Sequence, residues 1–437
     1  QNVFNIQTPV TIAIGVRYGK PNNRKQAKVH YSKVAGTREE KLLKLENLRT
    51  FKSASWQNCY SGWSKPFLPE GVGDYYSWPL LTDIFPWQQS GIKAGRTWVI
   101  SPERETLKKR WRTMLHADRE ERELLFKNSP TGRKVHESAT QLPPFASKLE
   151  PVSELAKDSQ PPDVVRFAYR SFDRQFIFAD PRLLDRPGPS IWGVNSDKQV
   201  FMTSLLTKVL GLGPAATVTS FIPDLDHFCN RGGKDVIPLY RDSQGLSANV
   251  SDGFIDKLNH VLGGQIAPED LFAYSYSLLS SPAYVEHFSE ELIIPGPRIP
   301  ITKNVKLFDK GVALGRRLIW LHTFGERFVP KGKEAETVHQ GKARCIEAVP
   351  GMRENYPDSF SYDELTKILQ VGDGKFGPVS REMWGFSVSG LEVIRSWLSY
   401  RMLSGAGRNS SQLDYILPER WTSQLTEQLL ELLWVLE

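Results

Sequence analysis

Residues 164 to 179 have the sequence VVRFAYRSFDRQFIFA, in which aromatic and basic side chains alternate. A period of two is the spacing of a β-strand, because successive side chains of a strand point to opposite faces. We therefore predict a strand or a hairpin that carries its arginines on one face and its aromatic residues on the other.

Short strands and helices are expected on both sides of this segment. Apolar runs bounded by turn residues predict strands, and leucines at helical spacing predict helices. The predicted strands cover 27–34, 200–206, 216–222, 367–371 and 382–388, and the predicted helices cover 38–45, 268–288 (one helix or two), 305–323, 391–402 and 425–436. The predicted fold class is α+β, with helices packed on several short mixed sheets.

Residues 51 to 100 are dense in aromatic residues, with Gly and Pro between them. Large aromatic side chains fill an irregular core or a domain interface, and this is the predicted role of the segment between Trp56 and Trp98. The alternative is a stacking platform for nucleic-acid bases.

A helix with one basic stripe is expected to follow. Ser101 can cap it, and Pro102 suits its first turn. Cations that recur every four residues share a helix face and could contact phosphates, although a solvated face beside Glu103 and Glu105 is the alternative. The candidate phosphate contacts are Arg104, Lys108 and Arg112 on this helix, and Lys208.

The overall charge favours a polyanionic partner such as nucleic acid. The chain has 56 Lys and Arg against 49 Asp and Glu, a formal net charge of +7. Its 3 cysteines are far apart and have no C-x-x-C spacing, which indicates neither a disulfide framework nor a zinc site and favours the cytoplasm. No apolar run approaches the ~20 residues of a membrane-spanning helix, so no membrane partner is expected.

A glycine-centred loop supplies a second group of candidate DNA contacts. Gly232 and Gly233 lack side chains, so their backbone could approach a phosphate or a groove floor closely. Arginine reads guanine bidentately, and Asn or Gln reads adenine. The candidate DNA-binding residues are Arg166, Arg170, Arg174 and Gln175 in the alternating segment, and Asn230, Arg231, Lys234 and Arg241 at the loop. The alternative is that the arginines form salt bridges with Asp173, Asp180, Asp235 or Asp242.

No catalytic or metal-binding signature is found in the sequence. A P-loop, an H-E-x-x-H pair and a G-x-S-x-G elbow are all missing, so no catalytic residue and no metal ligand are proposed. Ser281-Pro282-Ala283-Tyr284 approaches the tetrapeptide with which amino-methyltransferases hold a target amino group, but Ala283 replaces its second proline. We interpret it as a junction between two helices.

Several motifs together resemble the C-terminal specificity region of type ISP restriction-modification enzymes. The resemblance runs from about residue 160 to the end. It rests, in order, on YRSFDRQFI at 169–177, DPRLLDRP at 180–187, GKDVIPLYR at 233–241, PEDLFAY at 268–274, SGLEVIRSWLSYR at 389–401 and ELLWVLE at 431–437. Residues 1–45 look like the last strands of the methyltransferase core of such an enzyme. The chain has no initiator Met and opens on an apolar run, 5–17, expected to be a buried strand, so we expect a C-terminal piece of a larger polypeptide.

The resemblance implies a domain plan and partners. Residues 1–50 would be terminal strands of an α/β methyltransferase sheet, 51–160 a connecting region and 161–437 a target recognition domain. The parent polypeptide would join a nuclease, a helicase-like ATPase and an adenine-N6 methyltransferase that uses S-adenosylmethionine, whereas no cofactor is expected in this segment. Double-stranded DNA and the upstream domains would be its partners.

The leading hypothesis is that this segment recognises a DNA sequence and is itself non-catalytic. Two alternatives remain open from the sequence. One is a free-standing DNA methyltransferase with a degenerate site around Ser281 and Tyr284, and the other is a protein-docking module of a defence complex.

Overall fold

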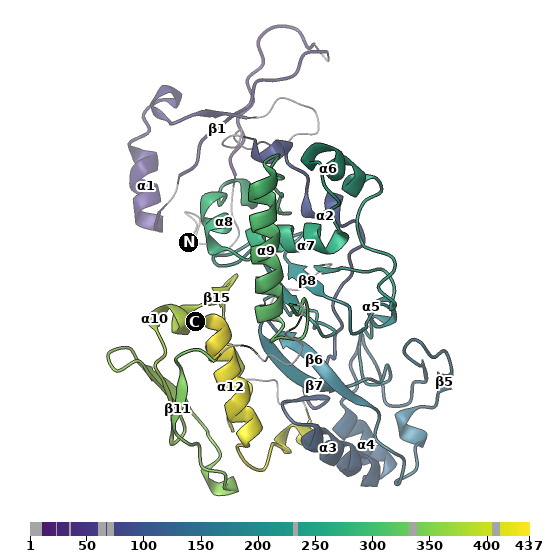
Figure 1. Ribbon diagram of the computed structural model, residues 1–437. Helices are drawn as coiled ribbons and strands as arrows, with labels where there is room; N and C mark the ends of the chain where they lie inside the picture. Colours follow the sequence, from purple (N-terminus) through teal and green to yellow (C-terminus); the bar gives the residue numbers. More distant parts are fainter. Residues whose placement is uncertain are drawn as a thin grey trace. The chain divides into compact units, whose positions relative to one another are not determined.

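The computed structural model describes residues 11–22, 24–34, 36–59, 67, 74–229, 235–330, 332, 338, 340–403 and 411–437 (Figure 1). The chain divides into two compact units, residues 1–77 and residues 78–437. The predicted domain boundaries at residues 50 and 160 stay predictions.

The smaller unit has little regular structure. Strand β1, His30–Tyr31, pairs antiparallel with β2, Gln57–Asn58. Helix α1, Arg38–Glu46, confirms the predicted helix and begins with a capping box between Thr37 and Glu40. The strand predicted over 5–17 is wrong for 11–17, which are exposed and form no strand, and 5–10 lie outside the described residues. The predicted strand over 27–34 is confirmed only at β1, and the methyltransferase origin of this segment stays a prediction.

The larger unit combines short sheets with helices, which confirms the α+β prediction. The pairings between its strands are antiparallel, so the sheets are not mixed as predicted, and parallel pairing within the described residues occurs at isolated bridges. Its strands are β3 Ile100–Ser101, β4 Ala139–Thr140, β5 Lys148–Leu149, β6 Val164–Arg170, β7 Asp173–Phe178, β8 Phe201–Ser204, β9 Ala216–Thr219, β10 Val236–Pro238, β11 Arg344–Glu347, β12 Phe360–Asp363, β13 Ile368–Val371, β14 Gly374–Gly377, β15 Ser387–Val388 and β16 Leu391–Glu392. Its α-helices are α2 Leu81–Ile84, α3 Arg104–His116, α4 Arg119–Phe126, α5 Pro189–Gly193, α6 Phe254–Leu262, α7 Pro268–Leu279, α8 Pro282–His287, α9 Val305–His322, α10 Arg381–Gly385, α11 Val393–Ser399 and α12 Ser423–Leu436.

The alternating segment forms the predicted hairpin. Strands β6 and β7 pair antiparallel, and β3 adds to the edge of β7, so that the strand order is β3-β7-β6. Arg166 lies opposite Phe176, and Ala168 lies opposite Arg174. Because paired residues of an antiparallel sheet share a face, Arg166, Arg174 and Phe176 lie on the same side of the hairpin, and the predicted separation of arginines from aromatic residues is wrong for Phe176.

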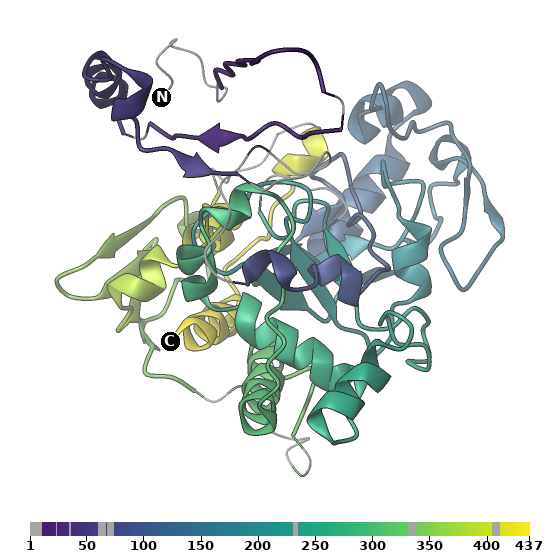
Figure 2. The same cartoon turned by 90° about the horizontal axis from the view of Figure 1, so that it is seen from above.

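Helices α7 and α9 pack against each other beside a second sheet, of order β10-β8-β9 (Figures 1 and 2). The predicted strands at 200–206 and 216–222 are confirmed as β8 and β9, and the predicted helices at 268–288 and 305–323 as α7, α8 and α9. A C-terminal sheet has the strand order β11-β14-β13-β12, and its strand β13 confirms the strand predicted over 367–371. Helix α12 confirms the predicted last helix.

Two predictions near the C-terminus are corrected. The strand predicted over 382–388 is wrong for most of its length, because Arg381–Gly385 form α10 and only β15 is extended. The Ser380 Oγ accepts a hydrogen bond from the Met383 backbone N at 3.2 Å and thereby caps this helix. The helix predicted from Leu391 begins two residues later, after Leu391 and Glu392 pair with β15 as β16.

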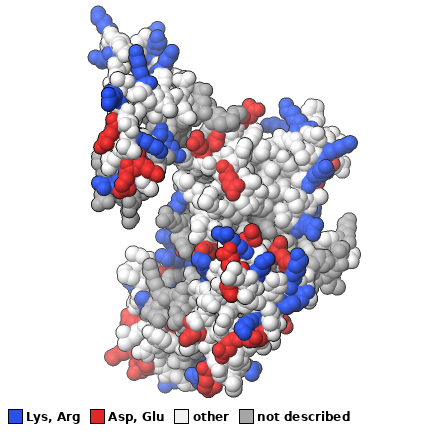
Figure 3. Space-filling view, turned by 90° about the vertical axis from the view of Figure 1, so that its left-hand side faces the viewer, with Lys and Arg blue, Asp and Glu red and all other residues white. Residues whose placement is uncertain are grey.

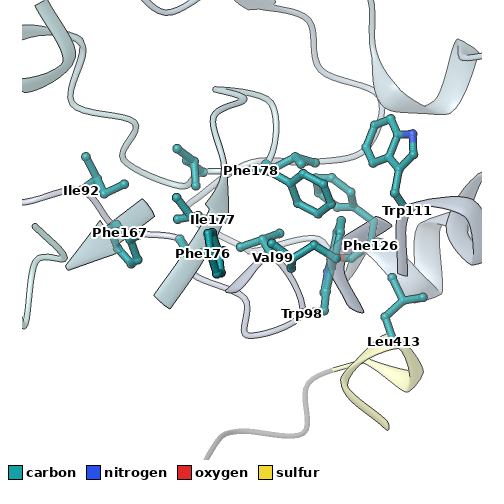
Figure 4. Packing of buried hydrophobic residues seen from close by; sticks show 14 of the residues in the cluster. Ile92, Trp98, Val99, Trp111, Phe126, Phe167, Phe176, Ile177, Phe178 and Leu413 are labelled. Carbon is teal, nitrogen blue, oxygen red and sulfur yellow. The ribbon is translucent and has the colours of Figure 1, made fainter. Parts of the chain in front are cut away.

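A hydrophobic core cluster lies between the hairpin and helices α3 and α4 (Figure 4). Phe178 lies edge-on to Trp98 at 6.3 Å between ring centroids and tilted against Trp111 at 5.8 Å. The predicted core role of the aromatic segment is confirmed at Trp98, which is fully buried, whereas Trp56 is 44% exposed. No helix in the described part of the chain is long and apolar enough to cross a bilayer.

Candidate nucleic-acid interface

Two arginines, one from α3 and one from β6, lie against the same aromatic ring of the hairpin, and a third arginine, on β7, lies on the same face of the hairpin. The guanidinium carbons of Arg104 and Arg166 lie 4.7 and 4.6 Å from the centroid of the Phe176 ring. Arg104, in the first turn of α3, also donates to the carbonyl oxygen of Val164 on β6. Arg174 is on the same face of the hairpin as Arg166. We call Arg104, Arg166 and Arg174 the arginine cluster.

The charges of the arginine cluster are only partly balanced. Burial lowers the pKa of Arg166 to about 10, the positive charges of Arg174 and Arg104 also lower it, and Glu326 and Glu431 oppose them. The Arg166 Nη1 is buried and has no hydrogen-bond partner. Arg174 is ion-paired with Glu431 of α12 and lies 3.5 Å above the Phe324 ring. Arg166 therefore keeps its positive charge near neutral pH, and its Nη1 is a donor that an anion could satisfy.

Two of the predicted hairpin residues have their polar groups engaged inside the protein. Arg170 is buried and forms an ion pair with Asp224 at 2.7 Å. Burial is the largest single effect and lowers the pKa of Arg170, but the Asp224 carboxylate, together with Tyr169, Tyr400 and Asp226, raises this pKa above its ordinary value. The Gln175 amide, also buried, donates to Asp173 Oδ2 at 2.9 Å. The salt-bridge alternative thus describes Arg170, with Asp224 as its partner, and the Gln175 amide is likewise engaged within the protein.

The remaining predicted contacts are scattered. Asn230, Arg231 and Lys234 lie outside the described residues. Arg241 is exposed, and its guanidinium donates to Asn249 Oδ1 at 3.3 Å and to the carbonyl oxygen of Val250 at 3.4 Å. Lys108 pairs with Glu105 at 2.6 Å, and Arg112 and Lys208 are exposed. The structure therefore brings Arg104, Arg166 and Arg174 together, and the DNA-contacting role of every candidate stays a prediction.

Sequence reasoning missed a basic surface on α9. Three exposed cations share its outer side, opposite the buried face formed by Phe308, Gly315 and Ile319, and a fourth exposed cation lies just before the helix begins. The spacings of four and seven residues between the three helical cations return to the same helix face, and this signal was visible in the sequence. We call this group the α9 basic stripe; its members are Lys303, Lys306, Lys310 and Arg317.

The degenerate methyltransferase tetrapeptide has a structural explanation. Ser281 and Pro282 begin α8, and Tyr284 is buried. The Tyr284 hydroxyl donates to the carbonyl oxygen of Arg298 at 2.6 Å and accepts from the Arg298 backbone N at 3.0 Å. Because this hydroxyl holds a loop, the residues do not fit a clamp for a target amino group. In the described part of the chain, no group of three or more His, Cys, Asp or Glu side chains is arranged to hold a metal ion.

Charged residues on the face of the larger unit drawn in Figure 3 are interspersed, with Lys and Arg beside Asp and Glu.

Residues 83–432 match the family model of the Type ISP C-terminal specificity domain. The chain belongs to this family. No curated protein matches this specificity domain.

Three solved structures share the fold of this specificity domain. They are the DrdV–DNA complex solved by cryo-electron microscopy (TM-score 0.57, 18% identity, 91% of this chain), a nuclease-deletion mutant of the Type ISP restriction-modification enzyme LlaGI in complex with a DNA substrate mimic (0.55, 17%, 94%), and the ATP-dependent Type ISP restriction-modification enzyme LlaBIII bound to DNA (0.59, 15%, 94%). The chain covers 40%, 32% and 27% of the length of those proteins, respectively.

Proposed function

We propose that this chain recognises the DNA target sequence of a restriction-modification enzyme. Membership of the Type ISP specificity family supports the proposal, and the single structural observation that carries it is the arginine cluster around Phe176. Arginine is the residue that most often reads a base specifically, through guanine O6 and N7, and it also binds phosphates.

The packing of the arginine cluster suits this task. Cation–π contact with Phe176 holds two guanidinium groups in place before any ligand arrives, which reduces the side-chain entropy lost on binding. The buried and unpartnered Arg166 Nη1 gains a hydrogen bond if an acceptor from DNA enters.

We extend the proposal to the whole enzyme. The similar structures belong to proteins of more than twice this length, and LlaBIII is ATP-dependent and bound to DNA. The parent polypeptide would therefore carry a nuclease, a helicase-like ATPase and an adenine-N6 methyltransferase that uses S-adenosylmethionine, and it would work in the cytoplasm. A docking role for this chain stays an untested alternative.

The test is selection from a pool of duplexes with a randomised centre, using the 437-residue chain. We expect one short sequence to be enriched. Arg166→Gln and Arg174→Gln should each lower the preference for that sequence by about 1–3 kcal/mol if they read a base. The matched control is Arg119→Gln, because Arg119 is exposed and, among the described residues, forms its ion pair with Glu154 alone, at 3.3 Å.

A pool without enrichment would contradict target recognition. Enrichment that both cluster variants leave unchanged would instead show that recognition resides elsewhere on the chain. Circular dichroism and thermal unfolding of each variant establish that the fold is retained.

A further inference from the structure

We propose that the α9 basic stripe is a second DNA-contacting surface, which binds the phosphate backbone and carries no base preference. This inference rests on the proposed DNA recognition. The stripe is separate from the arginine cluster, since it lies on another element and contains none of the residues predicted from the sequence.

The stripe is not neutralised by the protein. Within the described residues, no ion pair joins Lys303, Lys306, Lys310 or Arg317 to a carboxylate. Helix α3 differs, because Lys108 pairs with Glu105 and Lys109 with Glu419, each at 2.6 Å. Unpaired cations on one face keep the full attraction for a polyanion, whereas paired cations must first release their partners.

The placement of the stripe does not serve the stability of the helix. The first turn of α9 contains no acidic residue, and Lys306 is its second residue. Cations near a helix N-terminus oppose the macrodipole, and acidic residues are favoured there, as in α1 with Glu39 and Glu40. Cations at this end of α9 weaken the isolated helix, so binding of an anionic ligand explains their presence better than a contribution to folding does.

The length of the stripe matches a DNA strand. At 1.5 Å per residue, Lys306 and Arg317 lie about 16 Å apart along the helix axis. One strand of a duplex advances by about five phosphates over that distance. Long, flexible lysine side chains on a straight helix can therefore reach several successive phosphates, and a positively charged helix face of this kind has no means of distinguishing bases.

The arrangement of α9 also links the two surfaces. Phe324, which follows α9, stacks under Arg174 of the arginine cluster. Gly315 allows α9 to lie directly against α7, and both helices pack on β9. Phosphates on the stripe would thus fix the register in which the arginine cluster meets the bases.

The experiment compares two triple variants of the full chain with wild type on a labelled duplex of about 30 mixed-sequence base pairs, over a range of salt concentrations. The stripe variant is Lys306→Gln, Lys310→Gln and Arg317→Gln. The matched control is Lys127→Gln, Lys148→Gln and Lys157→Gln, which removes the same charge from exposed positions elsewhere in the larger unit. Glutamine and lysine have similar helix propensities, so α9 should persist.

We expect the stripe variant to bind about tenfold or more weakly at about 100 mM salt, with a slope of log affinity against log salt that is shallower by about 2–3. Its enriched sequence in the randomised pool should be unchanged, and the control should match wild type within about twofold.

The inference is overturned if the slope of log affinity against log salt is the same for the stripe variant as for wild type. It is also overturned if the stripe variant and the control lose DNA affinity equally, because equal losses would reflect net charge alone. Pool enrichment by wild type reports separately on the proposed function. If wild type enriches no sequence while the stripe variant still loses affinity, the proposed function fails and the phosphate surface stands. If wild type binds no duplex even in dilute salt, both are overturned.

Discussion

At the scale of single residues, a buried ion pair ties the hairpin to the C-terminal part of the larger unit. Arg401 Nη2 lies 2.7 Å from Asp173 Oδ1, and the two side chains are 0% and 2% exposed. Replacing Asp173 with Asn leaves the Arg401 charge buried and uncompensated. We expect Asp173→Asn to lower the free energy of unfolding by about 3–5 kcal/mol, measured by urea denaturation. Exposed Asp158→Asn is the control and should change it by less than about 0.5 kcal/mol.

The same residues show what the sequence could and could not predict about the candidate site. The period of two correctly placed Arg166 and Arg174 on one face, because their register is regular. The period of two could not show that Arg170 differs from these two arginines. The register shifts between Ala168 and Arg170, and a β-bulge redirects the Arg170 side chain. Its partner Asp224 is 54 residues away in the sequence, so no local pattern indicated the ion pair.

A buried histidine predicts acid sensitivity. His227 is 2% exposed, and burial, with the nearby charge of Arg170, lowers its pKa to about 3. An unfolded histidine has a pKa of about 6.5, so below this pH His227 binds a proton in the unfolded chain but not in the folded chain. Stability from this group is therefore lost as pH falls from about 6.5 towards 3, by about 2 kcal/mol at pH 5.

The measurement is urea unfolding of wild type and His227→Asn at about pH 7.5 and pH 5. The decrease in unfolding free energy between the two pH values should be smaller in the variant by about 2 kcal/mol. Exposed His260→Asn is the matched control for removing an imidazole. Equal decreases in wild type and His227→Asn would contradict the assignment.

At the scale of elements, α7 and α9 depend on a glycine for their close approach. A Cβ added at Gly315 would meet the Ala273 carbonyl oxygen at 1.8 Å, whereas one at Gly311 would meet the side chain of Tyr274 at 2.7 Å. Alanine is the better helix former, yet overpacking against backbone should outweigh that gain. We expect Gly315→Ala to destabilise the protein by about 3 kcal/mol and Gly311→Ala by about 1 kcal/mol or less, measured by urea unfolding. Similar effects of the two substitutions would contradict this packing.

Elements with strong periodicity were predicted well, and short elements were not. The bounds of α9 were predicted within one residue, because its apolar face repeats over five turns and Asn304 caps it. The region 382–388 was misread as a strand, because a helix of five residues has too few positions to display a period. Here a single cap, at Ser380, decides the local structure.

At the scale of the whole molecule, recognition is expected to reside in the larger unit. A hydrophobic core cluster of this unit draws residues from Ile92 to Leu413, and the family match covers 83–432. A core closed within one segment should make that segment fold on its own. We therefore predict that residues 78–437, expressed alone, unfold cooperatively and enrich the same DNA sequence as the full chain. The comparison uses thermal unfolding and selection from the same randomised pool. A fragment that folds but selects a different sequence would place part of the recognition surface in residues 1–77, and a fragment that does not unfold cooperatively would refute its independence.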